Sequence, residues 1–183
     1  TDLVPDTFDH GDSPKADQFD TFFGTRETAR MCIVMDPTGK IRYLDNRIMG
    51  ENIIVVLGES VSKAYLDHLR ELGISYLFAG PEGNDLNKAL ETLGDFGIRK
   101  IMLQGGGIIN AAFLKAGLID ELSLLIYPGI DGLAGVPAVF EYFGDNGKRP
   151  ANGQSLELLS MKQLQHGVAW LRYRFHPAPS KTE

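Results

Sequence analysis

Three consecutive glycines, Gly105, Gly106 and Gly107, interrupt an apolar segment that begins at Ile98 and resumes at Ile108. Glycines between a strand and a helix allow the backbone to approach a phosphate closely. The first amides of the helix are free to donate, and the helix dipole adds partial positive charge. The pattern therefore predicts a strand, a turn and a helix that bind the pyrophosphate of a dinucleotide. Since it is neither G-x-G-x-x-G nor a Walker sequence, a tight turn packed under a neighbouring strand is the alternative.

Two other loops with glycine follow predicted strands, namely Gly58-Glu59-Ser60 and Ala79-Gly80-Pro81. If the strands are parallel, all three loops open on the same edge of the sheet, as a dinucleotide site requires. Ser60 could bind a ribose or a 2′-phosphate, or it could cap the next helix. The candidate cofactor-binding residues are therefore Gly58, Ser60, Gly80, Gly105, Gly106, Gly107, Ile108 and Ile109.

Residues for other kinds of chemistry are sparse. Asp120 and Glu121 precede a predicted strand and fit a turn with solvated carboxylates. No G-x-S-x-G sequence is present, so acyl transfer has no support. Metal-ligand spacing is missing from the four histidines, which are His10, His68, His166 and His176. We expect no metal site, and the sequence identifies no catalytic residue.

Composition limits the class of protein. The chain has 183 residues and a net charge of −6, so no overall basic field attracts nucleic acid or an anionic membrane. Cys32 is the single cysteine, which excludes a disulfide within the chain. The apolar run from Ile53 to Leu57 is far shorter than the roughly 20 residues of a membrane helix. We expect a cytoplasmic protein that acts on a small molecule and binds neither nucleic acid nor membranes.

Alternating strands and helices must position the three loops. The hydrophobic patterns predict strands at residues 31–35, 53–57, 74–79, 98–103 and 121–127, with a possible hairpin arm at 40–44. They predict helices from Ser60 to Gly73, after Asp85, and from Gly107 to Gly117. Residues 155–162 and 168–175 predict an antiparallel C-terminal hairpin. The expected fold is α/β and three-layered, with a mainly parallel central sheet and this hairpin at one edge.

The distribution of charge and aromatic residues suggests how the chain is divided. Residues 1–30 carry an excess of acidic side chains and no apolar period, and Phe19, Phe22 and Phe23 could dock on another part of the chain, so these residues predict an acidic N-terminal arm. Residues 31–176 are expected to form the nucleotide-binding domain. Residues 177–183 are expected to form a tail.

A long compound signature makes the interpretation more specific. Residues 104–122 read QGGGIINAAFLKAGLIDEL and residues 127–132 read YPGIDG. Together they resemble the reductase domain of the riboflavin-biosynthesis deaminase-reductase family, in particular its stand-alone members. The resemblance covers roughly residues 31–176, from IIVVL through DLNKALETL to GVAWLRY. It implies a dihydrofolate-reductase-like fold and a homodimer. It also implies an NADPH-dependent reduction, in which hydride reaches the ring-opened ribosyl carbon of a pyrimidine ribosylamine phosphate.

The resemblance assigns roles by position. Gly106 to Ala112 match the pyrophosphate-binding turn and helix, and Gly58 to Ser60 and Gly80 match cofactor-side loops. Gln104 matches a position where family members often carry a glutamate that contacts the pyrimidine, so it is the candidate substrate-binding residue. Glutamine replaces a pure acceptor by a donor and an acceptor.

One departure from the family leaves alternatives open. The opening strand and S-L-D-G turn of family members are not found before residue 31, so we expect the sequence to lack the amino-terminal part of the domain. The alternatives to a pyrimidine reductase are a true dihydrofolate reductase and a non-catalytic nucleotide-binding or dimerisation module.

Overall fold

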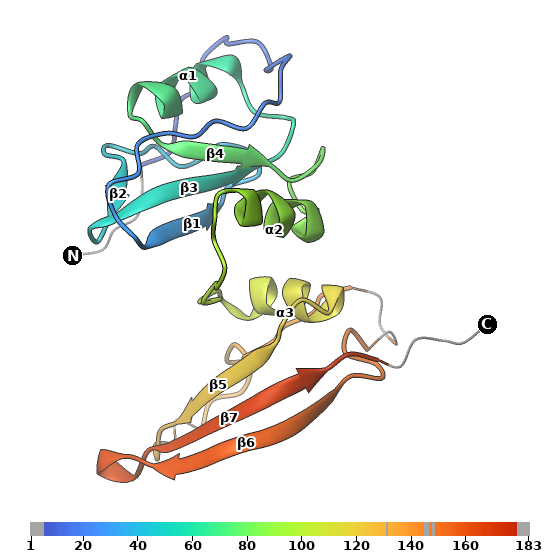
Figure 1. Ribbon diagram of the computed structural model, residues 1–183. Helices are drawn as coiled ribbons and strands as arrows, with labels where there is room; N and C mark the ends of the chain where they lie inside the picture. Colours follow the sequence, from blue (N-terminus) through green and yellow to red (C-terminus); the bar gives the residue numbers. More distant parts are fainter. Residues whose placement is uncertain (1–5, 131, 145–146, 148, 179–183) are drawn as a thin grey trace. The chain divides into compact units, whose positions relative to one another are not determined.

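The computed structural model describes residues 6–130, 132–144, 147 and 149–178. The chain divides into two compact units, a first unit up to Lys100 and a second unit from Ile101 (Figure 1). Among the described residues, no helix has both the length and the apolar character needed to cross a membrane.

The first unit contains a four-stranded sheet. Its strands are β1 (Met31–Met35), β2 (Arg47–Ile48), β3 (Glu51–Leu57) and β4 (Ser75–Phe78). The central strand β3 pairs in parallel with β1 and β4 and antiparallel with the short β2. Two helices, α1 (Lys63–Glu71) and α2 (Leu86–Asp95), complete the unit.

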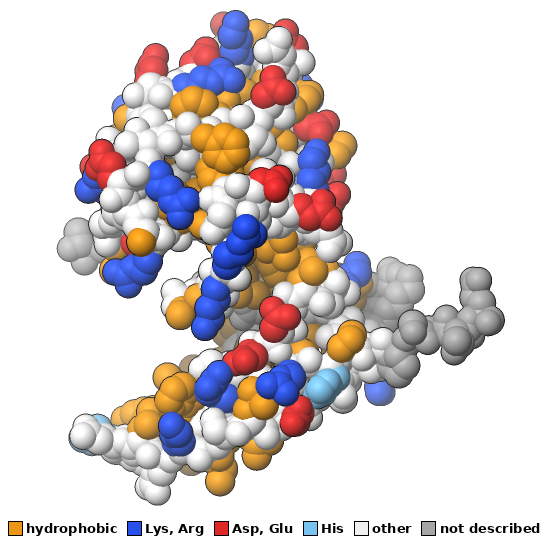
Figure 2. Space-filling view, in the orientation of Figure 1, with side chains coloured by type: hydrophobic (Ala, Val, Ile, Leu, Met, Phe, Trp, Pro, Cys, Tyr) orange, Lys and Arg blue, Asp and Glu red, His pale blue; other side chains and the backbone are white. Residues whose placement is uncertain are grey.

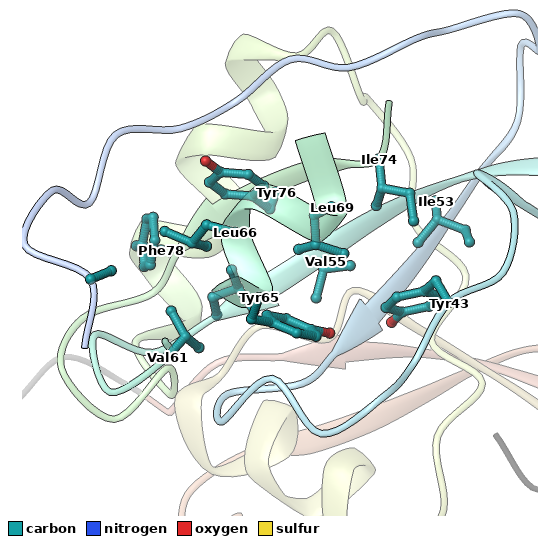
Figure 3. Packing of buried hydrophobic residues seen from close by; sticks show 12 residues of the cluster. Tyr43, Ile53, Val55, Val61, Tyr65, Leu66, Leu69, Ile74, Tyr76 and Phe78 are labelled. Atoms are coloured by element: carbon teal, nitrogen blue, oxygen red, sulfur yellow. The ribbon is translucent and has the colours of Figure 1, made fainter. Parts of the chain in front are cut away.

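The side chains of β3 are buried on both faces of the sheet. Ile53, Val55 and Leu57 pack with the apolar stripe of α1, as the close view in Figure 3 shows for most of this cluster. Ile54 and Val56 pack with α2. Successive residues of a strand point to opposite faces, so the two helices cover opposite faces of the sheet. Each such aliphatic side chain contributes roughly 1.5–3 kcal/mol when it is fully buried.

Both helices of the first unit begin at a capping side chain. Asp85 accepts a hydrogen bond from the amide of Lys88 (3.0 Å) and caps α2, as predicted. The predicted cap of α1 at Ser60 is wrong. Ser62 accepts from the amide of Tyr65 (3.2 Å) and so caps the helix, while Ser60 lies exposed in the preceding turn.

Residues 6–30 run along the first unit without forming a helix or a long strand. Isolated antiparallel bridges join Thr7 to Ile41, Lys15 to Ser62 and Phe22 to Tyr76. In the last of these, each amide donates to the other residue's carbonyl at 3.0 Å. The buried side chain of Asn52 then accepts hydrogen bonds from the amides of Glu27 and Thr28. The arm is therefore held along its length by backbone hydrogen bonds and by the side chain of Asn52.

The second unit contains the helix α3 (Gly107–Ala116) and an antiparallel sheet (Figure 1). The helix ends at the left-handed Gly117 as predicted. The sheet has the order β5-β7-β6, with β5 (Glu121–Ile126), β6 (Ser155–Gln163) and β7 (Ala169–His176). A short helix, η1 (Gln165–Gly167), joins β6 to β7. The predicted C-terminal hairpin is therefore confirmed.

The α/β class is confirmed, but the sheets are mixed or antiparallel. Strand β5 pairs antiparallel with β7 and does not extend a parallel sheet. Along the first part of β5, apolar and polar pairs alternate, because Leu122 and Leu124 lie opposite Tyr173 and Leu171, whereas Glu121 and Ser123 lie opposite Arg174 and Arg172. Such alternation is typical of antiparallel sheets, whereas strands buried in parallel sheets are apolar throughout.

Two predicted strands are absent from the described residues. Residues 98–103 have no regular structure, since no strand pairs with them and Ile101 and Met102 are exposed. Residues 40–44 form only the bridge at Ile41. There the amides of Lys40 and Ile41 donate to the carboxylate of Asp36 and do not join a strand ladder.

Candidate functional site

The start of α3 is the first component of the candidate site, and it lies in the second unit. Gly106 is the N-cap residue, with extended backbone angles (φ −66°, ψ 173°), and no side chain caps the helix. The first intrahelical bond runs from the amide of Asn110 to the carbonyl of Gly106 (3.1 Å). Within the described part of the chain, the amides of Gly107 and Ile108 have no acceptor. These free donors at the positive end of the helix can bind an anion.

The three glycines of this turn have different surroundings. A Cβ atom on Gly105 would overlap the side chain of Ile109, and one on Gly107 would lie 2.5 Å from the carbonyl oxygen of Ala138. A Cβ atom on Gly106 would have no neighbour within 4 Å. Tight packing therefore accounts for Gly105 and Gly107, while Gly106 leaves open space beside the free amides.

The loop after β3, in the first unit, is packed against two other loops. The amide of Gly58 donates to the carbonyl of Pro37 (2.9 Å), and the amide of Glu59 donates to that of Pro81 (2.9 Å). A Cβ atom on Gly58 would lie 2.9 Å from both carbonyl oxygens. The donor of Gly58 is thus already used, and this glycine serves close contact between loops at the carboxyl ends of β1, β3 and β4.

Two other candidate residues border the same loops. Gly80 follows β4 with φ +76°, and its carbonyl accepts from the amide of Gly83 (3.0 Å), which closes a tight turn. The side chain of Ser60 is exposed and has no hydrogen-bond partner among the described residues. Because Ser62 caps α1, Ser60 does not cap this helix. Of the two roles considered for Ser60, contact with a ligand remains.

Gln104 lies immediately before the glycine turn in the second unit. Its side chain is exposed, and its amide group donates to the sulfur of Met102 (3.0 Å). A contact this weak leaves the donor and the acceptor of Gln104 available to a polar ligand. Thus Gln104 and residues 105–109 belong to the second unit, whereas Gly58, Ser60 and Gly80 belong to the first.

A buried polar pair that the sequence did not reveal lies behind the loops of the first unit. Asp36 follows β1 directly and is only 5% exposed. Its carboxylate accepts hydrogen bonds from the amides of Lys40 and Ile41 (2.9 Å each) and from the hydroxyl of Tyr65 (2.8 Å). The available signals were the Asp-Pro-Thr-Gly turn sequence and a tyrosine within the apolar stripe of the helix.

Burial controls the ionisation of two tyrosines in this region. It raises the pKa of Tyr65 far above the ordinary value, and the negative charge of Asp36 raises it further. Burial also raises the pKa of Tyr43, again with a contribution from Asp36. Figure 3 shows the hydroxyl ends of these two rings pointing toward each other. Both phenols therefore stay protonated at neutral pH, and Tyr65 stays a hydrogen-bond donor.

No group of three or more His, Cys, Asp or Glu side chains that could hold a metal ion occurs in the ranges that the structure describes. In the second unit, the free amides at the start of α3, the side chain of Gln104 and the open space at Gly106 suit a phosphorylated organic ligand.

The chain is similar to known proteins over most of its length. Residues 11–170 match the model that describes the RibD C-terminal domain. Two similar curated proteins carry the name 2,5-diamino-6-ribosylamino-4(3H)-pyrimidinone 5′-phosphate reductase. The one from Aquifex aeolicus is 34% identical over 86 residues, which are 47% of this chain and 38% of the relative. The one from Methanothermobacter thermautotrophicus is 34% identical over 88 residues, which are 47% of this chain and 40% of the relative. The match thus spans about two fifths of each relative.

Two solved structures have a similar fold. A pyrimidine reductase-like protein from Corynebacterium diphtheriae has a TM-score of 0.63 and 19% identity, over 79% of this chain and 60% of its own. RibD from Acinetobacter baumannii has a TM-score of 0.61 and 24% identity, over 79% of this chain and 37% of its own. At these identities the comparison supports the fold alone. The resemblance expected from the glycine turn and the GLIDEL segment is confirmed by the family match over most of the sequence, and the chain belongs to the RibD C-terminal domain family.

Proposed function

We propose that this chain is a reductase that uses NADPH to reduce a pyrimidine ribosylamine phosphate of the riboflavin-biosynthesis type. Membership of the family and the names of the two curated relatives support the reaction class and the substrate class. The observation that carries the cofactor is the start of α3, where free amides stand beside the open space at Gly106.

The residues of α3 fit a pyrophosphate. The amides of Gly107 and Ile108 supply donors, and the helix N-terminus supplies about half a positive charge. Gly106 allows the ligand to approach because a side chain would fill the space in front of these donors. The bound cofactor would supply a hydride to the ring-opened ribosyl carbon. The chain's own part is to hold the phosphates and keep the substrate oriented.

The remaining candidates take polar roles in this proposal. Ser60, exposed after β3, would donate to a ribose hydroxyl or a 2′-phosphate, and Gly80 would shape the neighbouring loop. Gln104 would contact the pyrimidine, where its amide can donate to one ring substituent and accept from another. The roles of Ser60 and Gln104 can be removed singly, by Ser60→Ala and by Gln104→Ala.

The proposal includes a dihydrofolate-reductase-like fold and a homodimer. The two helices on opposite faces of a sheet with parallel β1, β3 and β4 support the fold.

One face of the β5-β7-β6 sheet supports the dimer, because it carries Leu156, Leu158 and Met161, which are about half exposed or more. Figure 2 shows hydrophobic side chains gathered over this part of the chain. Sedimentation would show a dimer that Met161→Glu weakens and Lys162→Glu, on the opposite face, leaves intact.

Calorimetry with NADPH tests the cofactor. We expect saturable binding to the full chain and weaker binding to Gly106→Val, since the valine side chain blocks the approach to the amides. Unchanged affinity in a folded Gly106→Val protein would refute the phosphate assignment.

Oxidation of NADPH with candidate substrates tests the reaction. We expect turnover with the pyrimidine ribosylamine phosphate and not with dihydrofolate. Turnover with dihydrofolate alone would identify a dihydrofolate reductase. Tight NADPH binding without turnover of either compound would identify a non-catalytic nucleotide-binding module.

A further inference from the structure

We propose that Asp36 and Tyr65 form a positioning pair that fixes the loop of residues 58–60 in the first unit. The pair lies behind the loop, where neither side chain is exposed to a ligand. The consequence for NADPH rests on the function proposed above. The effect on the loop itself can be measured without any ligand.

The first link is the carboxylate of Asp36, which holds the turn after β1. One oxygen accepts from the amide of Lys40, and the other accepts from the amide of Ile41 and from the hydroxyl of Tyr65. The turn is closed by the amide of Gly39, which donates to the carbonyl of Asp36 (3.1 Å). Because the carboxylate is buried, losing one of these donors leaves an acceptor without compensation from water.

The second link is the ring of Tyr65, which lies directly against this turn. Gly39 adopts φ +69°, and a Cβ atom there would lie 2.6 Å from the ring. Only a glycine satisfies both the left-handed conformation and the contact with Tyr65. The ring therefore fixes the turn by packing while its hydroxyl fixes it by a hydrogen bond.

The third link joins the turn to the loop. The carbonyl of Pro37, within the turn, accepts from the amide of Gly58 at 2.9 Å. A Cβ atom on Gly83 would lie 2.8 Å from both the side chain of Pro37 and the amide of Gly58. A shift of Pro37 would therefore move the loop of residues 58–60 and its neighbour after β4 together.

The arm holds Tyr65 from the other side. Phe8 packs edge-on against its ring, with the centroids 4.9 Å apart. Ser62, which caps α1 at the amide of Tyr65, also bonds the ring nitrogen Nδ1 of His10 (2.8 Å). Tyr65 is thus confined between the arm and the turn, so that deleting its hydroxyl removes from a fixed ring the contacts with the carboxylate of Asp36 (2.8 Å) and the carbonyl of Ile41 (3.1 Å), both in the turn region.

Tyr65→Phe is the test variant, and Tyr43→Phe is its matched control. Tyr43 belongs to the same buried cluster, but its hydroxyl has no hydrogen-bond partner among the described residues. Both variants remove one buried phenolic oxygen. Hydrogen exchange of the Gly58 amide reports on the loop, and calorimetry reports the Kd for NADPH.

We expect the Gly58 amide to exchange about tenfold faster in Tyr65→Phe, as loss of one hydrogen bond to a carboxylate implies. We expect the Kd for NADPH to rise about fivefold to tenfold by the same reasoning. Tyr43→Phe should match the wild type in the exchange rate of the Gly58 amide and in the Kd for NADPH. Asp36→Asn provides a second variant, and the double variant should be no worse than the more affected single one, since both substitutions break the same link.

Unchanged exchange at Gly58 in folded Tyr65→Phe and Asp36→Asn proteins would overturn the positioning pair. A lower Tm with unchanged Kd, in a wild type that binds NADPH, would also overturn it by reducing the pair to a stabilising contact. If the wild type does not bind NADPH, the proposed function fails, and the exchange of Gly58 still decides the role of the pair.

Discussion

Gly107 lies so close to Ala138 that a Cβ atom added to Gly107 would stand 2.5 Å from the carbonyl oxygen of Ala138. The same atom would lie 2.8 Å from a carboxylate oxygen of Glu141, whose amide donates to the carbonyl of Gly107. Gly107→Ala should therefore lower the free energy of unfolding by about 1–3 kcal/mol, the usual cost of overpacking. Urea unfolding measures this. A change below about 0.5 kcal/mol, typical of a surface site, would contradict the packing.

Gly106→Asp separates stability from ligand binding at the same turn. The extended backbone at Gly106 suits a capping aspartate, whose carboxylate would accept from the free amides of α3. We expect the free energy of unfolding to be unchanged or to rise by a few tenths of a kcal/mol. NADPH binding should weaken, because the carboxylate occupies the donors and repels phosphate. Equal or tighter binding, measured by calorimetry, would show that these amides do not hold the cofactor.

The two serines before α1 should differ when each is replaced by alanine. Ser62→Ala removes the cap of α1 and the contact with His10, and should cost about 1 kcal/mol of unfolding free energy. Ser60→Ala removes an exposed side chain and should stay within about 0.5 kcal/mol. Equal losses in urea unfolding would contradict the assignment of the cap to Ser62.

The buried side chains of Tyr65 and Tyr43 should make the protein less stable at high pH. The pKa of Tyr65 and that of Tyr43 are raised in the folded state by burial and by Asp36. Above about pH 10 the unfolded chain releases these protons while the folded chain keeps them, so stability falls as the pH rises. Each tyrosine contributes a slope of about 1.4 kcal/mol per pH unit in that range. Urea unfolding across this range should give a shallower decline for Tyr65→Phe, and an identical decline would refute the shift.

Local patterns were sufficient to predict several elements. The β-branched run of β3, the cap of α2 at Asp85 and the alternation in β7 each depend on neighbouring residues along the chain. The cap of α1 was misplaced because Ser60 and Ser62 are both competent caps, two residues apart. In the structure Ser62 is the cap, since its hydroxyl bonds both the amide of Tyr65 and the ring of His10.

Other features depend on contacts between distant segments. A strand at residues 98–103 requires a partner, and hydrophobic content alone does not supply one. The pair of Asp36 and Tyr65 joins positions 29 residues apart. The glycine turn before α3 was predicted from sequence, but the different surroundings of Gly106 and Gly107 follow from the segment around Ala138, which no local pattern identifies.

The bridge between Phe22 and Tyr76 has a further consequence for the behaviour of the protein in concentrated solution. Strand β4 pairs with β3 on one side, and Phe22 takes both hydrogen bonds of Tyr76 on the other. An uncovered, apolar sheet edge is a template for strands of other molecules. By pairing with β4 at Tyr76, the arm of residues 6–30 blocks this edge and so protects β4 from pairing with strands of other molecules.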